Sequence, residues 1–280
     1  MALPKPTLQA RPSAGLSFLT DESLFAATGV RLGFSRRQGG VSEPPYDGLN
    51  LGDHVEDDPM AVAENRALLL DAAGLGSTRL LTLNQVHGDV VLALDDDAAA
   101  AWEEVARAGA AGADGVHVGQ SDMAVPDVTA LLCFADCTPV IVMSPSGAYA
   151  VAHAGWRGAL AGIPAKAVAA LAALDVRAGR AVDPSEYNAY VGPHIGAECY
   201  ECGPDLVGRF VERFGSSCAR GADHLDLEAA VRASLAEAGI APERIASSGE
   251  CTACRDDLYF SYRKSGGRCG RHSAFAGRKE

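Results

Sequence analysis

The sequence VTALLCFADCTPVIVMSPSGAYAVAHAGWRG, from Val128 to Gly158, contains the most apolar part of the chain. Its runs of branched and aromatic residues are short and end at aspartate, proline or glycine, which is typical of buried β-strands. Asp136 and Pro139 interrupt the apolar run, so it does not resemble a membrane-spanning helix. We therefore expect three strands here, at residues 128–135, 139–144 and 148–154.

Similar short apolar runs predict strands elsewhere, at residues 30–35, 90–94 and 187–193. Alternation in LYFSYR (258–263) predicts a further strand with one aromatic face, which would line a pocket or close a sheet. Helical spacing of apolar residues, with proline or aspartate at the start and glycine at the end, predicts helices at residues 59–75, 164–176, 204–215 and 226–240. A short helix is expected within residues 95–115.

These strands and helices interleave without a strict β–α–β rhythm. The pattern favours a mixed α/β (α+β) domain over a doubly wound parallel sheet. The prolines of MALPKPTLQARPSAG suggest a loose N-terminal tail over residues 1–20, which leaves residues 21–280 as a single domain.

The 280-residue chain has a net charge of −12, which argues against binding to nucleic acids or to anionic membranes, because both need a basic face. Small-molecule substrates remain compatible with this charge. No signal peptide is evident, so we expect a cytoplasmic protein, either a monomer or a homodimer. In that compartment the eight cysteines would be reduced thiols or metal ligands.

Polar side chains stand at the ends of several expected strands, where ligands commonly bind. They include His87, Asp136, Cys137, His153 and His194. Two imidazoles and one thiolate are a suitable zinc set, with the fourth tetrahedral position left to water. A single such histidine is more often structural, a single cysteine is more often a small buried residue, and the spacing does not join them.

Two C-x-x-C pairs, Cys199/Cys202 and Cys251/Cys254, could build a structural zinc site together. The residues between them include two expected helices, more than a zinc ribbon carries. Independent thiols or a facultative disulfide are therefore the favoured alternative.

Glycine-flanked arginines suggest recognition of an anion. Arg157 lies in GWRGALAG and Arg37 in SRRQGGVS; the latter loop is followed by Asn50. Arg263 follows the expected aromatic strand. Neither loop is a P-loop or a dinucleotide-binding fingerprint, and solvated arginines are an equally good explanation.

Several motifs together resemble the YfiH-like family, long labelled laccase-domain or polyphenol oxidase proteins. These are NQVHG, ADGVHVGQSDMAVPDVTALLCFADCTPVIVMSP, VAHAGWRGALAGI, VGPHIGAECYEC and LYFSYRKSGGRCGR. The resemblance implies layered mixed sheets flanked by helices in a single catalytic domain, and zinc held by His87, Cys137 and His153. Cys202 stands where valine is usual, and GGRCGR departs from the family's pattern.

The resemblance also implies a purine nucleoside phosphorylase, acting on adenosine, inosine or methylthioadenosine with phosphate, that deaminates adenosine as well. Candidate catalytic residues are then Cys137, Asp136 and Arg157, and candidate substrate-binding residues are Arg37, Asn50 and Arg263. Two alternatives are a copper-dependent polyphenol oxidase and a metal-free hydrolase that uses Cys137 and His153. A non-enzymatic metal-binding protein would leave the arginine loops unexplained.

Overall fold

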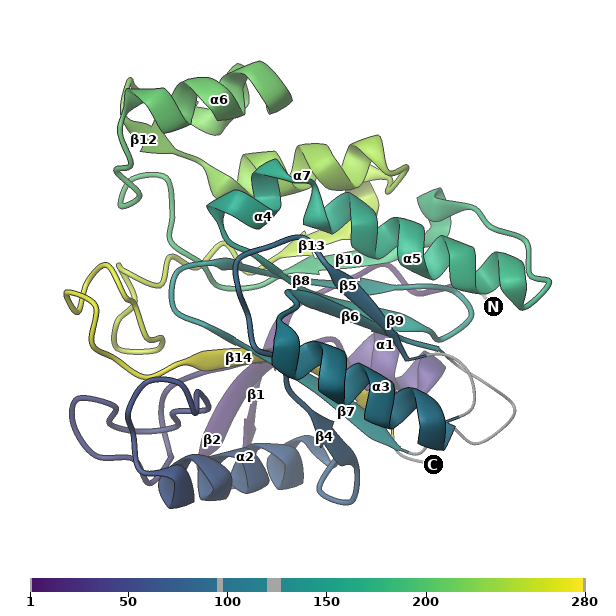
Figure 1. The fold of residues 1–280 in the computed structure, drawn as a ribbon, viewed down its shortest axis with the longest axis horizontal. Helices are drawn as coiled ribbons and strands as arrows, with labels where there is room; N and C mark the ends of the chain where they lie inside the picture. Colours follow the sequence, from purple (N-terminus) through teal and green to yellow (C-terminus); the bar gives the residue numbers. More distant parts are fainter. Residues whose placement is uncertain (1, 95–97, 120–126, 279–280) are drawn as a thin grey trace.

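The computed structural model describes residues 2–94, 98–119 and 127–278. Within them the strands form two six-stranded sheets and one two-stranded sheet (Figure 1). The first sheet has the order β1 (Gln9–Ser13), β2 (Leu16–Thr20), β3 (Val30–Ser35), β14 (His272–Arg278), β7 (Val128–Phe134) and β4 (Arg79–Leu81). The second has the order β13 (Ile245–Ser247), β10 (Asn188–Val191), β8 (Thr138–Met143), β9 (Tyr149–Ala154), β6 (Gly115–Val118) and β5 (Val91–Leu94).

The helices lie outside the sheets, and the two-stranded sheet lies beside them. The helices are α1 (Glu22–Thr28), α2 (Pro59–Ala73), α3 (Ala98–Ala111), α4 (Trp156–Leu160), α5 (Ile163–Arg177), α6 (Pro204–Phe214) and α7 (Leu227–Glu237). The short elements are β11 (Ala219–Arg220), β12 (His224–Leu225) and the 3₁₀ turns η1 (Pro184–Glu186), η2 (Ser216–Cys218) and η3 (Pro242–Arg244). The described part of the chain contains no helix with the length and apolarity needed to span a membrane.

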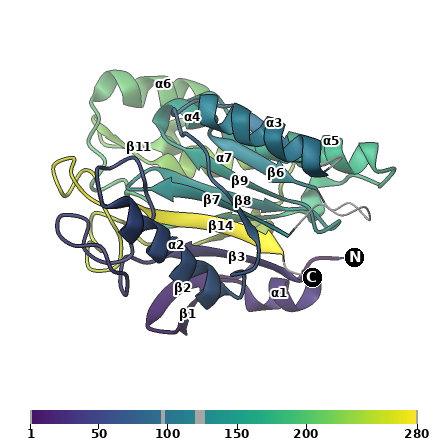
Figure 2. The ribbon, with the colours of Figure 1, turned by 60° about the horizontal axis from the view of Figure 1, so that its bottom comes forward.

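The two large sheets pack in layers, as Figures 1 and 2 show. Helices α4, α5 and α7 cover one face of the second sheet, the first sheet lies against the other face, and α2 covers the far side of the first sheet. Strand β8 alternates between two cores, because Val140 and Val142 face the helices while Ile141 and Met143 face the first sheet. Burial on both faces explains why its sequence is continuously apolar.

The predicted mixed α/β architecture is confirmed, and the six predicted apolar strands correspond to β3, β5 and β7 to β10. The predicted helices correspond to α2, α3, α5, α6 and α7. Helix α2 begins as its sequence indicates, with the Asp58 side chain accepting a hydrogen bond from the Met60 N–H and with Pro59 in the first turn. Residues 120–126 of the quoted family motif lie outside the described residues.

The expectation of a loose tail over residues 1–20 is wrong. Residues 9–20 form the antiparallel pair β1–β2, which extends the first sheet beyond β3. Leu16, Phe18 and Leu19 of β2 are buried in the cores. Strand β1 can contain Pro12 because it is an edge strand. One side of it has no neighbouring strand, so a missing backbone N–H there costs no hydrogen bond within the sheet.

The strand expected at LYFSYR is also wrong, because residues 255–267 form successive hydrogen-bonded turns. Tyr259 and Phe260 are neighbours in the chain and both are fully buried, whereas Tyr262 is 54% exposed. Burial therefore does not alternate. The strand that follows this segment is β14, which lies inside the first sheet between β3 and β7.

Replacing Val142 with alanine should reduce the free energy of unfolding by about 2 kcal/mol, because it removes two buried methyl groups from the core beneath the helices. Urea denaturation measures the change. Val176→Ala is the matched control: this valine is 63% exposed, and its loss should change stability by less than about 0.5 kcal/mol. Equal effects of the two substitutions would contradict the layered packing.

Candidate metal centre

Three predicted ligands from separate segments meet at the end of the second sheet. His87 lies in the loop between β4 and β5, Cys137 lies between β7 and β8, and His153 belongs to β9. Their nearest ligand atoms all lie within 4.8 Å of one another, and the two imidazole rings meet edge to face with centroids 4.8 Å apart. The antiparallel register pairs Pro139 with His153, which brings Cys137 beside that imidazole.

The buried carboxylate of Asp114 organises this group. It accepts hydrogen bonds from three successive backbone N–H groups, at 3.2 Å from Val86, 2.9 Å from His87 and 2.6 Å from Gly88. The same carboxylate lies 2.8 Å from Nδ1 of His153. Asp114 therefore positions the His87 loop. Because it holds Nδ1 of His153, it leaves Nε2 as the nitrogen that can bind a metal.

Electrostatic interactions and hydrogen bonds within the group shift the pKa values of Asp114, Cys137 and His153. Burial raises the pKa of Asp114, but the His153 imidazole and the backbone donors of Gly88 and His87 together hold it below its ordinary value. Burial also raises the pKa of the Cys137 thiol, yet the charge and hydrogen bonds of the two imidazoles lower it to about 6. Burial lowers the pKa of His153, whereas Cys137 and Asp114 raise it to about 9. Cys137 is thus held as a thiolate, the form that binds metals.

Gly155 leaves the space in which the three side chains converge. A Cβ atom at this position would stand 2.9 Å from Cδ2 of His87 and 3.1 Å from Sγ of Cys137. The first distance is shorter than real Cβ contacts allow. Only glycine therefore fits without pushing the ligands apart.

The group is closed by protein on one side and open on the other. His153 is buried and Cys137 half-buried, whereas His87 is exposed. The His87 loop is tied to β7 by two hydrogen bonds of 2.8 Å between the Gln85 side-chain amide and the Cys133 backbone. Three protein donors with an open side correspond to a catalytic rather than a structural metal site.

Asp136, next to Cys137, fastens the C-terminal loop to this centre. Its φ angle of 93° is in the region that favours glycine. Its carboxylate accepts hydrogen bonds of 2.7 Å from Oγ1 of Thr252 and of 2.7 Å from the backbone N–H of Arg263. Its carbonyl accepts a bond from the Ile195 N–H. Both carboxylate oxygens of Asp136 thus contact loop residues.

Two of the four remaining predicted residues present exposed guanidinium groups. Arg157 belongs to α4, which begins directly after Gly155. Its guanidinium carbon lies 4.4 Å from the centroid of the Trp156 ring. Arg263 lies 5.5 Å from the centroid of Tyr200. The structure thus places both guanidinium groups at the surface.

The other two predicted residues hold loops together. Arg37 binds the Asp47 side chain at 3.0 Å and the Asp256 carbonyl at 3.1 Å. Asn50 is fully buried, and its amide bonds Asp57, Gly52 and the Arg271 backbone. Asn50 thus holds these loops together, and the substrate-binding role expected for it stays a prediction.

Two residues of the site escaped the sequence reasoning. Asp114 had a local signal, since an aspartate between Ala113 and Gly115 directly precedes an apolar strand. Tyr200 lies near the centre: burial, followed by the charge of Cys137, raises the pKa of its phenol. No local pattern in the sequence indicates that Tyr200, in the loop after β10, lies near Cys137.

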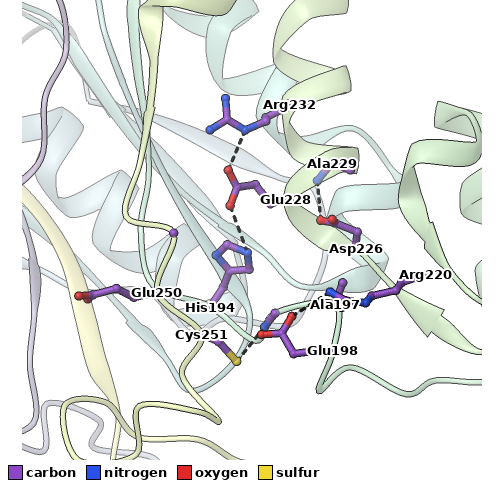
Figure 3. Close-up of a pocket in the computed structure, with 12 residues that line it drawn as sticks. His194, Ala197, Glu198, Arg220, Asp226, Glu228, Ala229, Arg232, Glu250 and Cys251 are labelled. Atoms are coloured by element: carbon purple, nitrogen blue, oxygen red, sulfur yellow. Dashed lines mark hydrogen bonds and ion pairs between the residues drawn. The ribbon is translucent and has the colours of Figure 1, made fainter.

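His194 lies apart from the three ligands. Figure 3 shows it pointing toward Glu228, with its Nε2 3.7 Å from the carboxylate. The two residues line a pocket of about 340 Å³ between α7 and the loops after β10 and β13. His194 therefore lines a separate pocket.

Comparisons with known proteins agree with this architecture. A family model described as multi-copper polyphenol oxidoreductase laccase matches residues 31–279. The chain is 33% identical over 261 residues to the purine nucleoside phosphorylase YlmD of Geobacillus stearothermophilus, covering 90% of this chain and 91% of the relative. It is 36% identical over 254 residues to a purine nucleoside phosphorylase of Deinococcus radiodurans, covering 87% of each. The crystal structure of YlmD from Geobacillus stearothermophilus superposes with a TM-score of 0.80 at 30% identity over the whole of both chains.

Replacing Asp114 with asparagine should weaken metal binding by about 10- to 100-fold, because it removes the acceptor that orients His153 and the His87 loop. Competition with a chromophoric chelator measures the affinity. Asp89→Asn makes the same change at a more exposed aspartate, two residues after His87 in the same loop, and should leave the affinity unchanged. An unaltered affinity in Asp114→Asn would refute the orienting role.

Replacing Gly155 with alanine should lower metal content per chain after dialysis, since the added methyl group would displace His87 and Cys137. The backbone at Gly155 is extended, so the effect is steric rather than conformational. Gly208→Ala, where a Cβ atom meets nothing within 4 Å, is the control and should retain the metal. Full metal content in both variants would show that the ligands do not converge at Gly155.

Proposed function

The chain belongs to the family described as multi-copper polyphenol oxidoreductase laccase, and from that membership we propose that it is a zinc-dependent purine nucleoside phosphorylase. Two of its relatives bear the name purine nucleoside phosphorylase. Adenosine, inosine and methylthioadenosine are the proposed substrates, and adenosine deamination is a proposed second activity.

The observation that carries this proposal is the open centre of His87, Cys137 and His153. The donors suit zinc, which binds imidazole nitrogen and thiolate sulfur, and Asp114 already fixes one imidazole. Bound zinc would supply Lewis-acid chemistry at the position left open by the three ligands. The exposed side at His87 gives a substrate access to that position.

Phosphorolysis requires cationic anchors for phosphate and hydrogen-bond donors for the departing purine. Arg157 and Arg263 are the proposed anchors, because both guanidinium groups are exposed on elements next to the ligands. Tyr200 supplies an aromatic face and a hydroxyl group near Cys137. Asp136 holds the Arg263 segment in place through its two loop contacts.

The name of the family model makes copper oxidase chemistry the first alternative. Multicopper oxidation needs several histidine-rich centres. Of the seven histidines, only His87 and His153 join a metal-ligating group in the described residues. At this centre the donor set therefore favours a single zinc ion over a multicopper cluster.

The second alternative, a metal-free hydrolase, rests on a specific arrangement. Asp114, His153 and Cys137 form a hydrogen-bonded line of the kind that activates a cysteine nucleophile. Such a line needs one imidazole. Here a second, that of His87, also lowers the pKa of Cys137, and two imidazoles around one thiolate favour a metal.

Incubation of the purified protein with adenosine and phosphate should produce adenine and ribose 1-phosphate, and inosine from the second activity. Chromatography separates the products, and metal analysis of the same sample should show zinc. Chelation should abolish turnover and zinc should restore it. Iodoacetamide-sensitive hydrolysis by metal-free protein would identify the thiol hydrolase instead.

Replacing Arg157 with alanine should raise the KM for phosphate about tenfold or more while zinc is retained, because an exposed anion contact is worth roughly 1.5 kcal/mol or more. Steady-state kinetics at varied phosphate measure this. Arg209→Ala removes an arginine that lies 5.9 Å from the same Trp156 ring and serves as the control. A phosphate KM unchanged in Arg157→Ala would exclude the anchor role.

A further inference from the structure

A second group of metal-ligating side chains lies outside the centre described above. It consists of Glu198, Cys199, Cys251 and Cys254, whose nearest ligand atoms all lie within 4.8 Å of one another. The group joins two loops that are far apart in the sequence. These loops follow β10 and β13, which pair in parallel, so both leave the sheet at the same edge.

The distances within the group match a tetrahedral metal site. Sγ of Cys199 lies 3.4 Å from Sγ of Cys254, which in turn lies 3.9 Å from Oε1 of Glu198. Zinc bound to thiolates at about 2.3 Å separates its sulfur ligands by about 3.8 Å in a tetrahedron. We propose that Glu198, Cys199, Cys251 and Cys254 bind a second zinc ion, which has a structural role because protein atoms fill all four positions.

Neighbouring groups orient these donors. The Gly196 N–H donates a hydrogen bond of 3.1 Å to Sγ of Cys251, a contact that stabilises thiolate charge. Arg220 lies 3.7 Å from Oε2 of Glu198, which leaves Oε1 on the side of Cys254. Figure 3 shows Cys251 and Glu198 together at one end of the pocket.

The arrangement differs from the pairing that the two C-x-x-C motifs suggested. Cys251 and Cys254 act together, but Cys202 packs against the helix-side core and its N–H bonds the Asp223 carbonyl. Glu198 takes the fourth position. A disulfide between Cys199 and Cys254 would not account for the Cys251 thiol and the Glu198 carboxylate, whose ligand atoms converge with theirs within 4.8 Å.

This zinc would fasten the loop that borders the first centre. Thr252, between two of the proposed ligands, donates the hydrogen bond to Asp136, and Arg263 follows in the same series of turns. These turns lack strand partners up to β14, so a crosslink near their start limits their freedom. The second site thus supports the position of Asp136 without sharing a ligand with the first.

The test is the metal content of the full chain, purified after expression with added zinc. Wild type should contain two zinc ions per chain, Cys254→Ser one, and Cys137→Ser one. Cys202→Ser, the matched control, should retain two. If only the first centre failed to bind metal, wild type and Cys137→Ser would each contain one zinc and Cys254→Ser none, so the outcomes for the two sites are distinguishable.

Thiol titration of the denatured, unreduced protein with chelator present gives a second measurement. Eight reactive thiols per chain accompany the zinc site. If Cys254→Ser contained as much zinc as wild type, the proposal would be overturned. Six reactive thiols in wild type would then indicate a disulfide, and eight would indicate thiols that bind no metal.

Glu198→Ala covers the case in which Cys254→Ser fails to fold, because Glu198 is exposed. Its second zinc should transfer to a chelator at least about tenfold faster than that of wild type. An unchanged transfer rate would remove Glu198 from the site.

Discussion

The buried carboxylate of Asp114 is the interaction on which the arrangement of the first centre depends. A charge in the interior is costly unless donors surround it, and here three backbone N–H groups and one imidazole do so. The contacts join the loop that carries His87 to the strand that carries His153. They also account for the lowered pKa of Asp114 despite its burial. One carboxylate therefore sets the geometry of two proposed ligands, His87 and His153.

The layered sheets supply the rigid frame for this arrangement. Strands β8 and β9 are buried on both faces. Packing against the helices and against the first sheet therefore fixes the positions of Cys137, directly before β8, and of His153 in β9. The adjacent turn is strained at Asp136, whose φ angle is 93°. Its contacts with Thr252 and Arg263 hold that turn and connect it to the C-terminal loop. The proposed second zinc lies near the start of the same loop, at Cys251 and Cys254. The two centres would therefore be connected through the hydrogen bond from Thr252 to Asp136.

Much of the fold could be predicted because its strongest signals are local. Continuous apolar runs identified β7, β8 and β9, and the Asp58–Pro59 start identified α2. The wrong predictions concern segments whose structure depends on contacts with residues far away in the sequence. Strand β2 joins the first sheet by pairing with β3 and is buried in cores built by distant residues, and the aromatic residues of LYFSYR lie in turns rather than in a strand. For the site, residue type and family resemblance selected the two histidines and Cys137, but Asp114, Tyr200 and the role of Asn50 depended on contacts between segments.

The sequence by itself determined the apolar periodicity, and hence the mixed α/β layers, along with the chemical character of the donors. Only the tertiary structure decided which donors meet. Metal ligation requires atoms from separate segments to lie within a few ångströms, and linear spacing does not specify this when the segments are joined by strands and helices. For the same reason Cys202 lies outside the second group while Glu198 belongs to it, although the sequence pairs Cys202 with Cys199.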